Sequence, residues 1–323
     1  MRPVVVRAPA KINLHLGVGA RRRDGYHPLT TVYQAVSLYD ELTAAPADHW
    51  QLAIGRRQPA RRGRDPARRD EHRHAGGRAA RGPPRRTRPR VGGDREAGSG
   101  YGRDGRGSAD GAAALVALDR LWDLGTSTGT LLQLAAELGS DVPFALLGGT
   151  ALGTGRGELV EPLDDAGRWW WTIVPSPEGM STAAVYAHSD ELHPDADPEP
   201  LSAGDLLQAL ATGDPRRLAA TLHNDRQTAA LDLRPDLAAT IVKGEVEGAL
   251  AGLVSGSGPT CVFLCDSQEA AVAVGQAFTR QGHERVLVAE GPVRARARWS
   301  RTDGPPAQPR ASVQGLRRPS AAG

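Results

Sequence analysis

The chain has 323 residues, of which 40% are hydrophobic and 24% charged, and its formal net charge is +3. This length allows two domains, or one large domain with tails, and two cysteines are too few for a disulfide framework. No apolar run approaches the roughly 20 residues of a membrane span, and the first residues lack the apolar region of a signal peptide. We therefore expect a cytoplasmic protein without a membrane partner.

The basic residues are concentrated in one window, residues 56–106. This window holds 17 arginines and 6 acidic residues, a net charge of +11, and it contains no lysine, Leu, Ile, Phe or Met. Such a composition cannot bury enough apolar surface to offset the entropy lost on ordering, so we expect disorder. A basic arm for nucleic acid is the alternative interpretation. Because Tyr101 is its only aromatic residue for base stacking, we expect no nucleic-acid partner.

Elsewhere the hydrophobic periodicity predicts a mixed α and β protein. In residues 12–18 apolar residues alternate with polar ones, so that Lys11, Asn13 and His15 share one face of a strand. Cys261 and Cys265 would lie on one face of a later strand, as buried and unreactive thiols. We expect strands over 4–7, 12–18, 31–33, 41–43, 169–175, 259–265 and 284–290, helices over 111–124, 129–138, 202–212, 215–230, 234–250 and 267–281, and a disordered tail after residue 300.

Two polar segments contain residues suited to phosphate or hydroxyl chemistry. Lys11 and Asn13 could donate hydrogen bonds to a phosphate or a hydroxyl, although a solvated strand face explains them as well. Lys11 is one of two lysines against 38 arginines, which favours a need for a compact ammonium at this position. Asp141 follows a helix stop and precedes Pro143, a pattern typical of a helix N-cap. It could equally be a base for a substrate hydroxyl.

Two glycine-containing segments complete the set. Residues 104–111 precede an alanine-rich helix, where backbone N–H groups and the helix dipole can bind phosphate. Asp104 and Arg106 fit such a loop poorly. The segment 255–260 reads Ser-Gly-Ser-Gly-Pro-Thr and enters a strand, as a plain tight turn also would.

Taken together and in this order, the segments resemble the GHMP kinase superfamily. The resemblance rests on Pro-Ala-Lys-Ile-Asn-Leu at 9–14, Asp-Gly-Tyr-His at 24–27, Gly-Ser-Ala-Asp-Gly at 107–111, Gly-Ser-Asp-Val-Pro at 139–143 and the turn at 255–259. It covers about 1–50 and 107–298. The Asp-Gly-Tyr-His element is the most specific part and indicates kinases of a cytidine-diphosphate-linked methylerythritol, which act in non-mevalonate isoprenoid biosynthesis.

The resemblance implies ATP-dependent phosphorylation of the 2-hydroxyl of that small molecule, with Mg²⁺ carried by the ATP phosphates. Lys11 and Asp141 match the catalytic pair of the family. Its substrate contacts correspond to Asn13, Tyr26, His27, Thr182 and Tyr186. Its nucleotide loop corresponds to Gly105, Gly107, Ser108, Ala109 and Asp110.

The resemblance also implies an α+β fold of two domains. Residues 1–160 would form a ribosomal-S5-like, ATP-binding N-terminal domain, and residues 161–299 a C-terminal α/β sandwich domain, with a disordered tail over 300–323. The assembly would be a monomer or a homodimer. Another GHMP kinase, such as a homoserine kinase, is the alternative enzyme.

The window 56–106 departs from the family, which has a strand, a helix, a strand and a glycine-rich loop there. When the codons of residues 100–106 are read from their second base in a GC-rich gene, they encode Ala or Gly interspersed with Thr or Met, leading into Gly107. Such a run is typical of the missing loop. We hypothesise that two compensating frame errors, near Gly55 and Arg106, scrambled the window. The alternative is an inactive kinase-like protein whose phosphate loop is lost.

Sequencing the gene across codons 50–110 tests this hypothesis. We expect one missing or extra base at each edge of the window, because two compensating shifts would restore both the loop and the downstream frame. DNA that encodes the printed residues without a shift would instead favour the inactive kinase-like protein.

Overall fold

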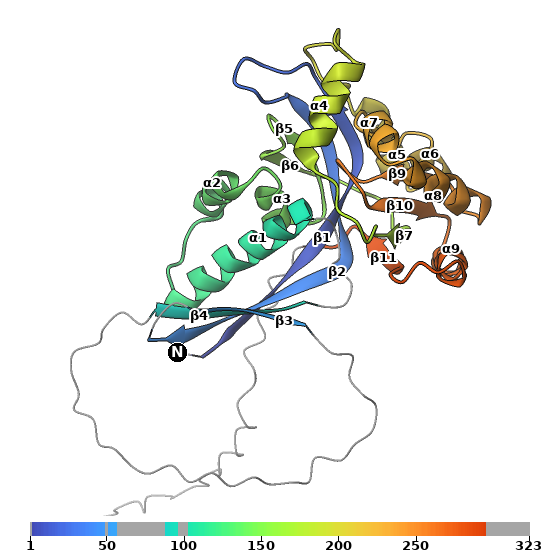
Figure 1. The fold of residues 1–323 in the computed structure, drawn as a ribbon. Coiled ribbons are helices and arrows are strands. Elements are labelled where there is room, and N and C mark those ends of the chain that lie inside the picture. Colours follow the sequence, from blue (N-terminus) through green and yellow to red (C-terminus); the bar gives the residue numbers. More distant parts are fainter. Residues whose placement is uncertain (1, 49–50, 57–87, 96–102, 295–323) are drawn as a thin grey trace, which may run out of the picture.

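The computed structural model describes residues 2–48, 51–56, 88–95 and 103–294, which form two β-sheets with helices packed against them (Figure 1). The first sheet contains β1 (Val4–Val18), β2 (Leu29–Ala47), β3 (Gln51–Arg56), β4 (Arg88–Arg95), β5 (Thr150–Thr154), β6 (Leu159–Leu163) and β8 (His223–Asn224). The second contains β7 (Trp169–Val174), β9 (Ala251–Val254), β10 (Cys261–Cys265) and β11 (Leu287–Gly291). The predicted α+β class is confirmed.

Two long antiparallel strands, β1 and β2, form the centre of the first sheet, in the order β3-β4-β2-β1-β8. The four short strands predicted between residues 4 and 43 are therefore two. Register shifts at Pro9/Ala10 and between Asn13 and His15 bend β1 without ending it. Such irregularities locally change which way side chains point. They flank the segment that carries Lys11 and Asn13.

Helix α1 (Arg103–Trp122) packs along β1 and β2 through a row of small side chains (Figure 1). Ala109, Ala113, Ala117 and Leu121 are spaced four residues apart, so they lie on one helix face. They are buried against Val6, Ala8, Leu42 and Ala44. We expected this helix to begin at residue 111, which was wrong: residues 103–110 are helical, because packing of Ala109 extends the helix beyond its glycines.

The prediction of disorder across 56–106 was wrong for part of that window. Residues 88–95 form β4, which pairs antiparallel with Asp40–Ala47 of β2 and parallel with β3. Hydrogen bonding of the backbone to a strand on each side does not require apolar side chains. Composition alone therefore could not predict strand β4. Residues 57–87 and 96–102, like the tail from 295 onward, lie outside the described residues.

The second sheet, in the order β11-β7-β10-β9, has two buried faces. Phe263, Cys261 and Cys265 pack toward α8 (Pro235–Val246) and α9 (Gln268–Arg280). Burial raises the pKa of Cys261 to about 12 and that of Cys265 to about 11. The prediction of buried thiols on one strand face is confirmed, and both cysteines are free.

The opposite face of the second sheet shares a hydrophobic core with the first. Trp171 on β7 and Leu264 on β10 pack in one cluster with Ile12 and Leu14 of β1. The indole Nε1 of Trp171 donates to Oε1 of Gln34 on β2 at 3.0 Å, in a buried position. The two sheets are therefore joined by apolar packing and by a buried hydrogen bond.

The remaining helices connect and cover these sheets. They are α2 (Thr128–Leu138), α3 (Val142–Leu147), α4 (Thr182–Leu192), α5 (Gly204–Thr212), α6 (Pro215–Ala219) and α7 (Gln227–Leu233). Ser127 caps α2 by accepting from the N–H of Thr130, and the helix ends at Gly139. The single helix expected over 215–230 was wrong, because His223 and Asn224 leave the helical path to pair with β1. No described helix is long and apolar enough to cross a membrane.

Gly244 tests the packing of the second sheet. A Cβ at Gly244 in α8 would lie 2.1 Å from the ring of Phe263, so we expect Gly244→Ala to lower the free energy of unfolding by about 1–3 kcal/mol. The matched control is Gly129→Ala in α2, where the nearest atom is 4.0 Å away. Helix propensity should leave that variant unchanged or stabilised by up to about 1 kcal/mol. Chemical denaturation measures both, and equal effects would contradict the packing.

Candidate active site

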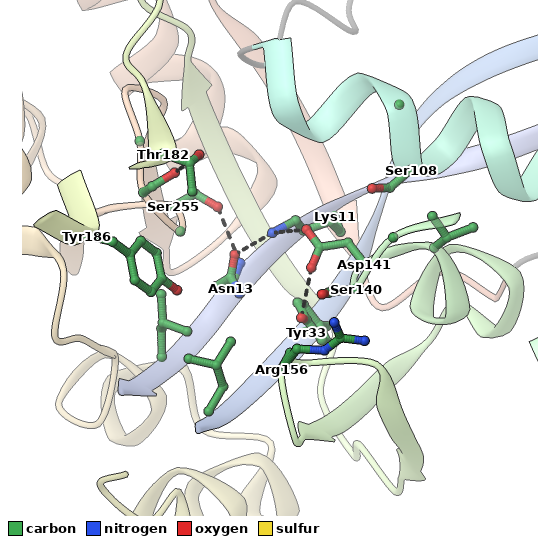
Figure 2. A pocket seen from close by; sticks show the side chains of 18 of the residues that line it. Lys11, Asn13, Tyr33, Ser108, Ser140, Asp141, Arg156, Thr182, Tyr186 and Ser255 are labelled. Carbon is green, nitrogen blue, oxygen red and sulfur yellow. Dashed lines mark hydrogen bonds and ion pairs between the residues drawn. The ribbon is translucent and has the colours of Figure 1, made fainter. Parts of the chain in front are cut away.

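A cavity of about 960 Å³ opens between the first sheet, helices α1, α3 and α4, and the turn before β10. Its walls combine both halves of the chain, as Figure 2 shows. Its polar lining includes Lys11, Asn13, Tyr26, His27, Tyr33, Ser108, Ser140, Asp141, Arg156, Thr182, Tyr186, Asp190, Ser255 and Ser257. A concave space with convergent polar groups is the usual form of a small-molecule site.

Lys11 and Asp141 form an ion pair in this cavity, with Nζ 3.1 Å from Oδ2. Their side chains are 22% and 28% exposed. Asp141 stands at the N-cap position of α3, but its side chain makes no capping hydrogen bond. The capping interpretation is therefore wrong for the carboxylate, which pairs directly with Lys11 at the cavity wall (Figure 2).

The Asp141 carboxylate has a second polar neighbour, Tyr33 on β2. The Tyr33 hydroxyl donates to Oδ1 of Asp141 at 2.9 Å. Burial by itself would raise the pKa of Asp141, but the Lys11 charge and the hydrogen bonds from Lys11 and Tyr33 outweigh it and lower that pKa. Asp141 is therefore ionised at neutral pH.

Asn13 connects the ion pair to the surrounding backbone. Its Oδ1 accepts from Nζ of Lys11 at 2.8 Å, and its Nδ2 donates to Oγ1 of Thr31 at 2.9 Å. Its backbone N–H donates to Oγ of Ser255 at 3.3 Å. The Asn13 side chain is buried, with one hydrogen bond at its oxygen and one from its nitrogen, so it holds the lysine ammonium in a defined position.

A second group of side chains lines the part of the cavity near α4. Nε2 of His27 lies 2.8 Å from Oδ1 of Asp190, and the His27 ring is 5.1 Å from that of Tyr186. The guanidinium of Arg226 lies 4.3 Å from the Tyr186 ring centroid. Burial lowers the pKa of His27, and the hydrogen bond to Asp190 only partly offsets this effect. A neutral imidazole beside aromatic rings is suited to a flat heterocycle.

Tyr26 and Arg156 stand at the open side of this group. Tyr26 is 53% exposed, and the Arg156 guanidinium lies 4.9 Å from the centroid of its ring. Asp24 and Gly25 form a turn, in which Gly25 has a φ of 85° and its N–H donates to the carbonyl of Arg22. That turn presents Tyr26 to the cavity.

The glycine turn before β10 closes the wall near Thr182. Thr182 Oγ1 and Ser257 Oγ are 2.7 Å apart. Nδ2 of Asn224 donates to the carbonyls of Val254 and Gly256 and so holds the turn. The turn positions the hydroxyls of Ser255 and Ser257 at the cavity.

The proposed nucleotide residues lie in the first turns of α1 instead of in a loop. Gly107, Ser108 and Ala109 line the cavity, so the N-terminal end of the helix reaches it. Gly105 belongs to the same helix. Among the described residues, those that line the cavity do not include Asp110. The expected glycine loop is therefore replaced by helix over 103–110.

The structure brings together most of the predicted site residues, namely Lys11, Asn13, Tyr26, His27, Asp141, Thr182 and Tyr186. Tyr33, Arg156 and Asp190 also line the cavity and were not predicted from the sequence. Tyr33 lies in a largely apolar strand, and its place opposite Asn13 depends on the register of β1 and β2, which the sequence does not give. Arg156 and Asp190 gave no signal beyond ordinary surface charge.

Comparison with known proteins identifies the chain's relatives. The model of the GHMP kinases N terminal domain matches residues 90–149, and that of GHMP kinases C terminal matches residues 206–284. The chain is 54% identical to the 4-diphosphocytidyl-2-C-methyl-D-erythritol kinase of a Nocardioides species, over 89% of this chain and 97% of the relative. It is 50% identical to the enzyme of the same name from Nocardia farcinica, over 90% and 94% of the two chains.

The solved structures agree with this assignment. A crystal structure of 4-(cytidine 5'-diphospho)-2C-methyl-D-erythritol kinase superposes with a TM-score of 0.64 at 26% identity, over 88% of this chain and 98% of that one. A homoserine kinase from Cytophaga hutchinsonii superposes with a TM-score of 0.58 at 18% identity, which shows a shared fold alone. The chain therefore belongs to the GHMP kinases, in the family of the 4-diphosphocytidyl-2-C-methyl-D-erythritol kinases.

Proposed function

We propose that this kinase transfers the γ-phosphoryl group of ATP to the 2-hydroxyl of 4-diphosphocytidyl-2-C-methyl-D-erythritol, in non-mevalonate isoprenoid biosynthesis. The observation that carries the proposal is the Lys11–Asp141 ion pair, which lies in a cavity with a helix end on one side and an aromatic group on another. The names of the relatives at 50–54% identity support this substrate.

In the proposed reaction Asp141 is the base and Lys11 the electrostatic partner. The hydroxyl oxygen attacks the γ-phosphorus, its proton passes to the Asp141 carboxylate, and the bond to the bridging oxygen breaks to release ADP. A lowered pKa keeps Asp141 ionised and able to accept that proton. The Lys11 ammonium orients the hydroxyl and offsets developing negative charge, since positioning and electrostatics carry most phosphoryl transfer.

The N-terminal end of α1 would receive the ATP phosphates, because its N–H groups and dipole favour anions. The nucleotide residues proposed there are Gly105, Gly107, Ser108, Ala109 and Asp110, of which Gly107, Ser108 and Ala109 line the cavity. Among the described residues, no group of three or more His, Cys, Asp and Glu could hold a metal ion. We therefore propose that Mg²⁺ enters with the nucleotide phosphates and that its chemistry is to neutralise their charge.

The aromatic group near α4 would bind the cytidine part of the substrate. The rings of Tyr26 and Tyr186 offer stacking faces, and the neutral His27 offers a hydrogen bond to the base edge. Asn13 and Thr182 would contact the polyol and its phosphates. These roles match the chemistry of a nucleoside diphosphate, which has a flat base at one end and hydroxyls at the other.

We propose the domain division at about residue 160, with ATP on residues 1–160 and the substrate cleft completed by residues 161–299. The shared core of the two sheets supports a cleft with fixed walls. A cytoplasmic location follows from the use of ATP as donor. Monomer or homodimer assembly stays a prediction.

Substitution of the ion pair tests the reaction. We expect Asp141→Asn to lower kcat by at least about 100-fold, because the amide cannot accept the proton. Lys11→Met should lower kcat, and Lys11→Arg should not restore it, because a guanidinium fork replaces a compact ammonium. Steady-state kinetics measures both.

The control is Lys243→Met, which changes the chain's other lysine, paired with Glu247 on α8 at 2.7 Å. Its kcat should equal that of the parent chain. Full activity of Asp141→Asn would contradict the proposed base.

Direct assay with alternative acceptors tests the substrate. The full chain is incubated with Mg-ATP and either the cytidyl substrate or homoserine, and ³¹P NMR identifies the product. We expect transfer to the cytidyl substrate alone, with a KM for ATP above the usual micromolar-to-millimolar range, because α1 replaces a glycine loop. Transfer to homoserine would support the alternative kinase, and no transfer at saturating ATP would support an inactive kinase-like protein.

A further inference from the structure

We propose that Tyr33 is a positioning residue for the base, whose hydroxyl holds one oxygen of the Asp141 carboxylate while Lys11 holds the other. This inference rests on the proposed function, because it concerns how the base of that reaction is oriented. The Tyr33 hydroxyl lies 2.9 Å from Oδ1, and Nζ of Lys11 lies 3.1 Å from Oδ2.

Two contacts on different oxygens fix the plane of the carboxylate. Figure 2 shows Lys11 and Tyr33 meeting Asp141 at its two oxygens. An ionised carboxylate has about four lone-pair sites, so these contacts leave room to accept a substrate hydroxyl. Because Asp141 caps no helix end, Tyr33 and Lys11 supply the orientation that a capping bond would otherwise give.

The backbone around Tyr33 leaves space for its ring and its hydroxyl. A Cβ at Gly157 would lie 2.4 Å from the Tyr33 hydroxyl oxygen, and a Cβ at Gly153 would lie 2.6 Å from its Cε2. Phe144 of α3 stacks on the ring at 4.9 Å between centroids. The ring is thus packed in one orientation, which aims the hydroxyl at Asp141.

The charges around the pair keep Tyr33 a donor. Burial raises the pKa of Tyr33 well above its ordinary value, and the neighbouring Asp141 charge and the hydrogen bond to it raise it further. Tyr186 and Glu158 add smaller effects in the same direction. The phenol therefore stays protonated across the working pH range and donates to Asp141.

The same hydrogen bond stabilises the ionised form of Asp141. Its removal takes away one of the contributions that lower the Asp141 pKa, while Lys11 remains. Arg156, which also lines the cavity, is not changed by that removal. The pKa of Asp141 then rises, so that on lowering the pH the carboxylate becomes protonated earlier, at a higher pH than in the parent chain. The acidic limb of the plot of kcat against pH therefore moves to higher pH.

The test is Tyr33→Phe in the full chain, which keeps the ring and removes the hydroxyl. We expect kcat to fall about tenfold, as for loss of a hydrogen bond to a charged group. The KM for the acceptor should stay within about twofold of the parent value, and the acidic limb of kcat should move to higher pH. The matched control is Tyr39→Phe on the same strand, which should leave both kcat and the limb unchanged.

A second readout does not depend on activity. Titration of the Asp141 carboxyl carbon by ¹³C NMR, assigned with Asp141→Asn, should give a higher pKa in Tyr33→Phe than in the parent chain. Unchanged kcat, pH limb and Asp141 pKa would show an ordinary core tyrosine and overturn the proposal, as would a raised KM with unchanged kcat. If the parent chain transfers no phosphate but the Asp141 pKa still differs between the parent and Tyr33→Phe, the proposed reaction is overturned. The hydrogen bond between Tyr33 and Asp141 is then still supported.

Discussion

The ion pair between Lys11 and Asp141 is the interaction on which the rest of the site depends. It joins the centre of β1 to the start of α3, and each side chain is roughly three-quarters buried. A largely buried charge that loses its partner is costly, so the surrounding structure must hold both groups in place. Asn13 does this for the lysine, and Tyr33 does it for the carboxylate.

The fold supplies these contacts from distant parts of the chain. The register shifts in β1 flank Lys11 and Asn13, and β2 places Tyr33 opposite Asn13. The turn before β10 reaches the same point from the second sheet through Ser255. Because the shared core of Trp171, Leu264 and Ile12 fixes the two sheets together, these groups meet with little freedom. The chemistry proposed for the cavity therefore depends on packing some distance from it.

Much of the site could be predicted from the sequence, because it is built from short local motifs. Lys11, Asp141 and His27 each belong to a segment with a recognisable order of residues, and the structure places them around one cavity. The buried strand of Cys261 and Cys265 followed from its continuous run of apolar residues.

The parts that could not be predicted depend on long-range contacts. Tyr33 acquires its role only through a hydrogen bond to a residue more than 100 positions away. The helical form of residues 103–110 depends on packing of Ala109 against β1 and β2, which outweighs the local glycines. Strand β4 depends on backbone pairing with β2 and β3, which composition does not report.

A crystal structure of the full chain with the cytidyl substrate and a non-hydrolysable ATP analogue would test the central claim most directly. We predict that the acceptor hydroxyl lies within about 2.6–3.2 Å of an Asp141 carboxylate oxygen, with the γ-phosphate beside Lys11. The Tyr33 hydroxyl should stay on the same carboxylate. A hydroxyl bound away from Asp141, with the ion pair left undisturbed, would show that Asp141 is not the base.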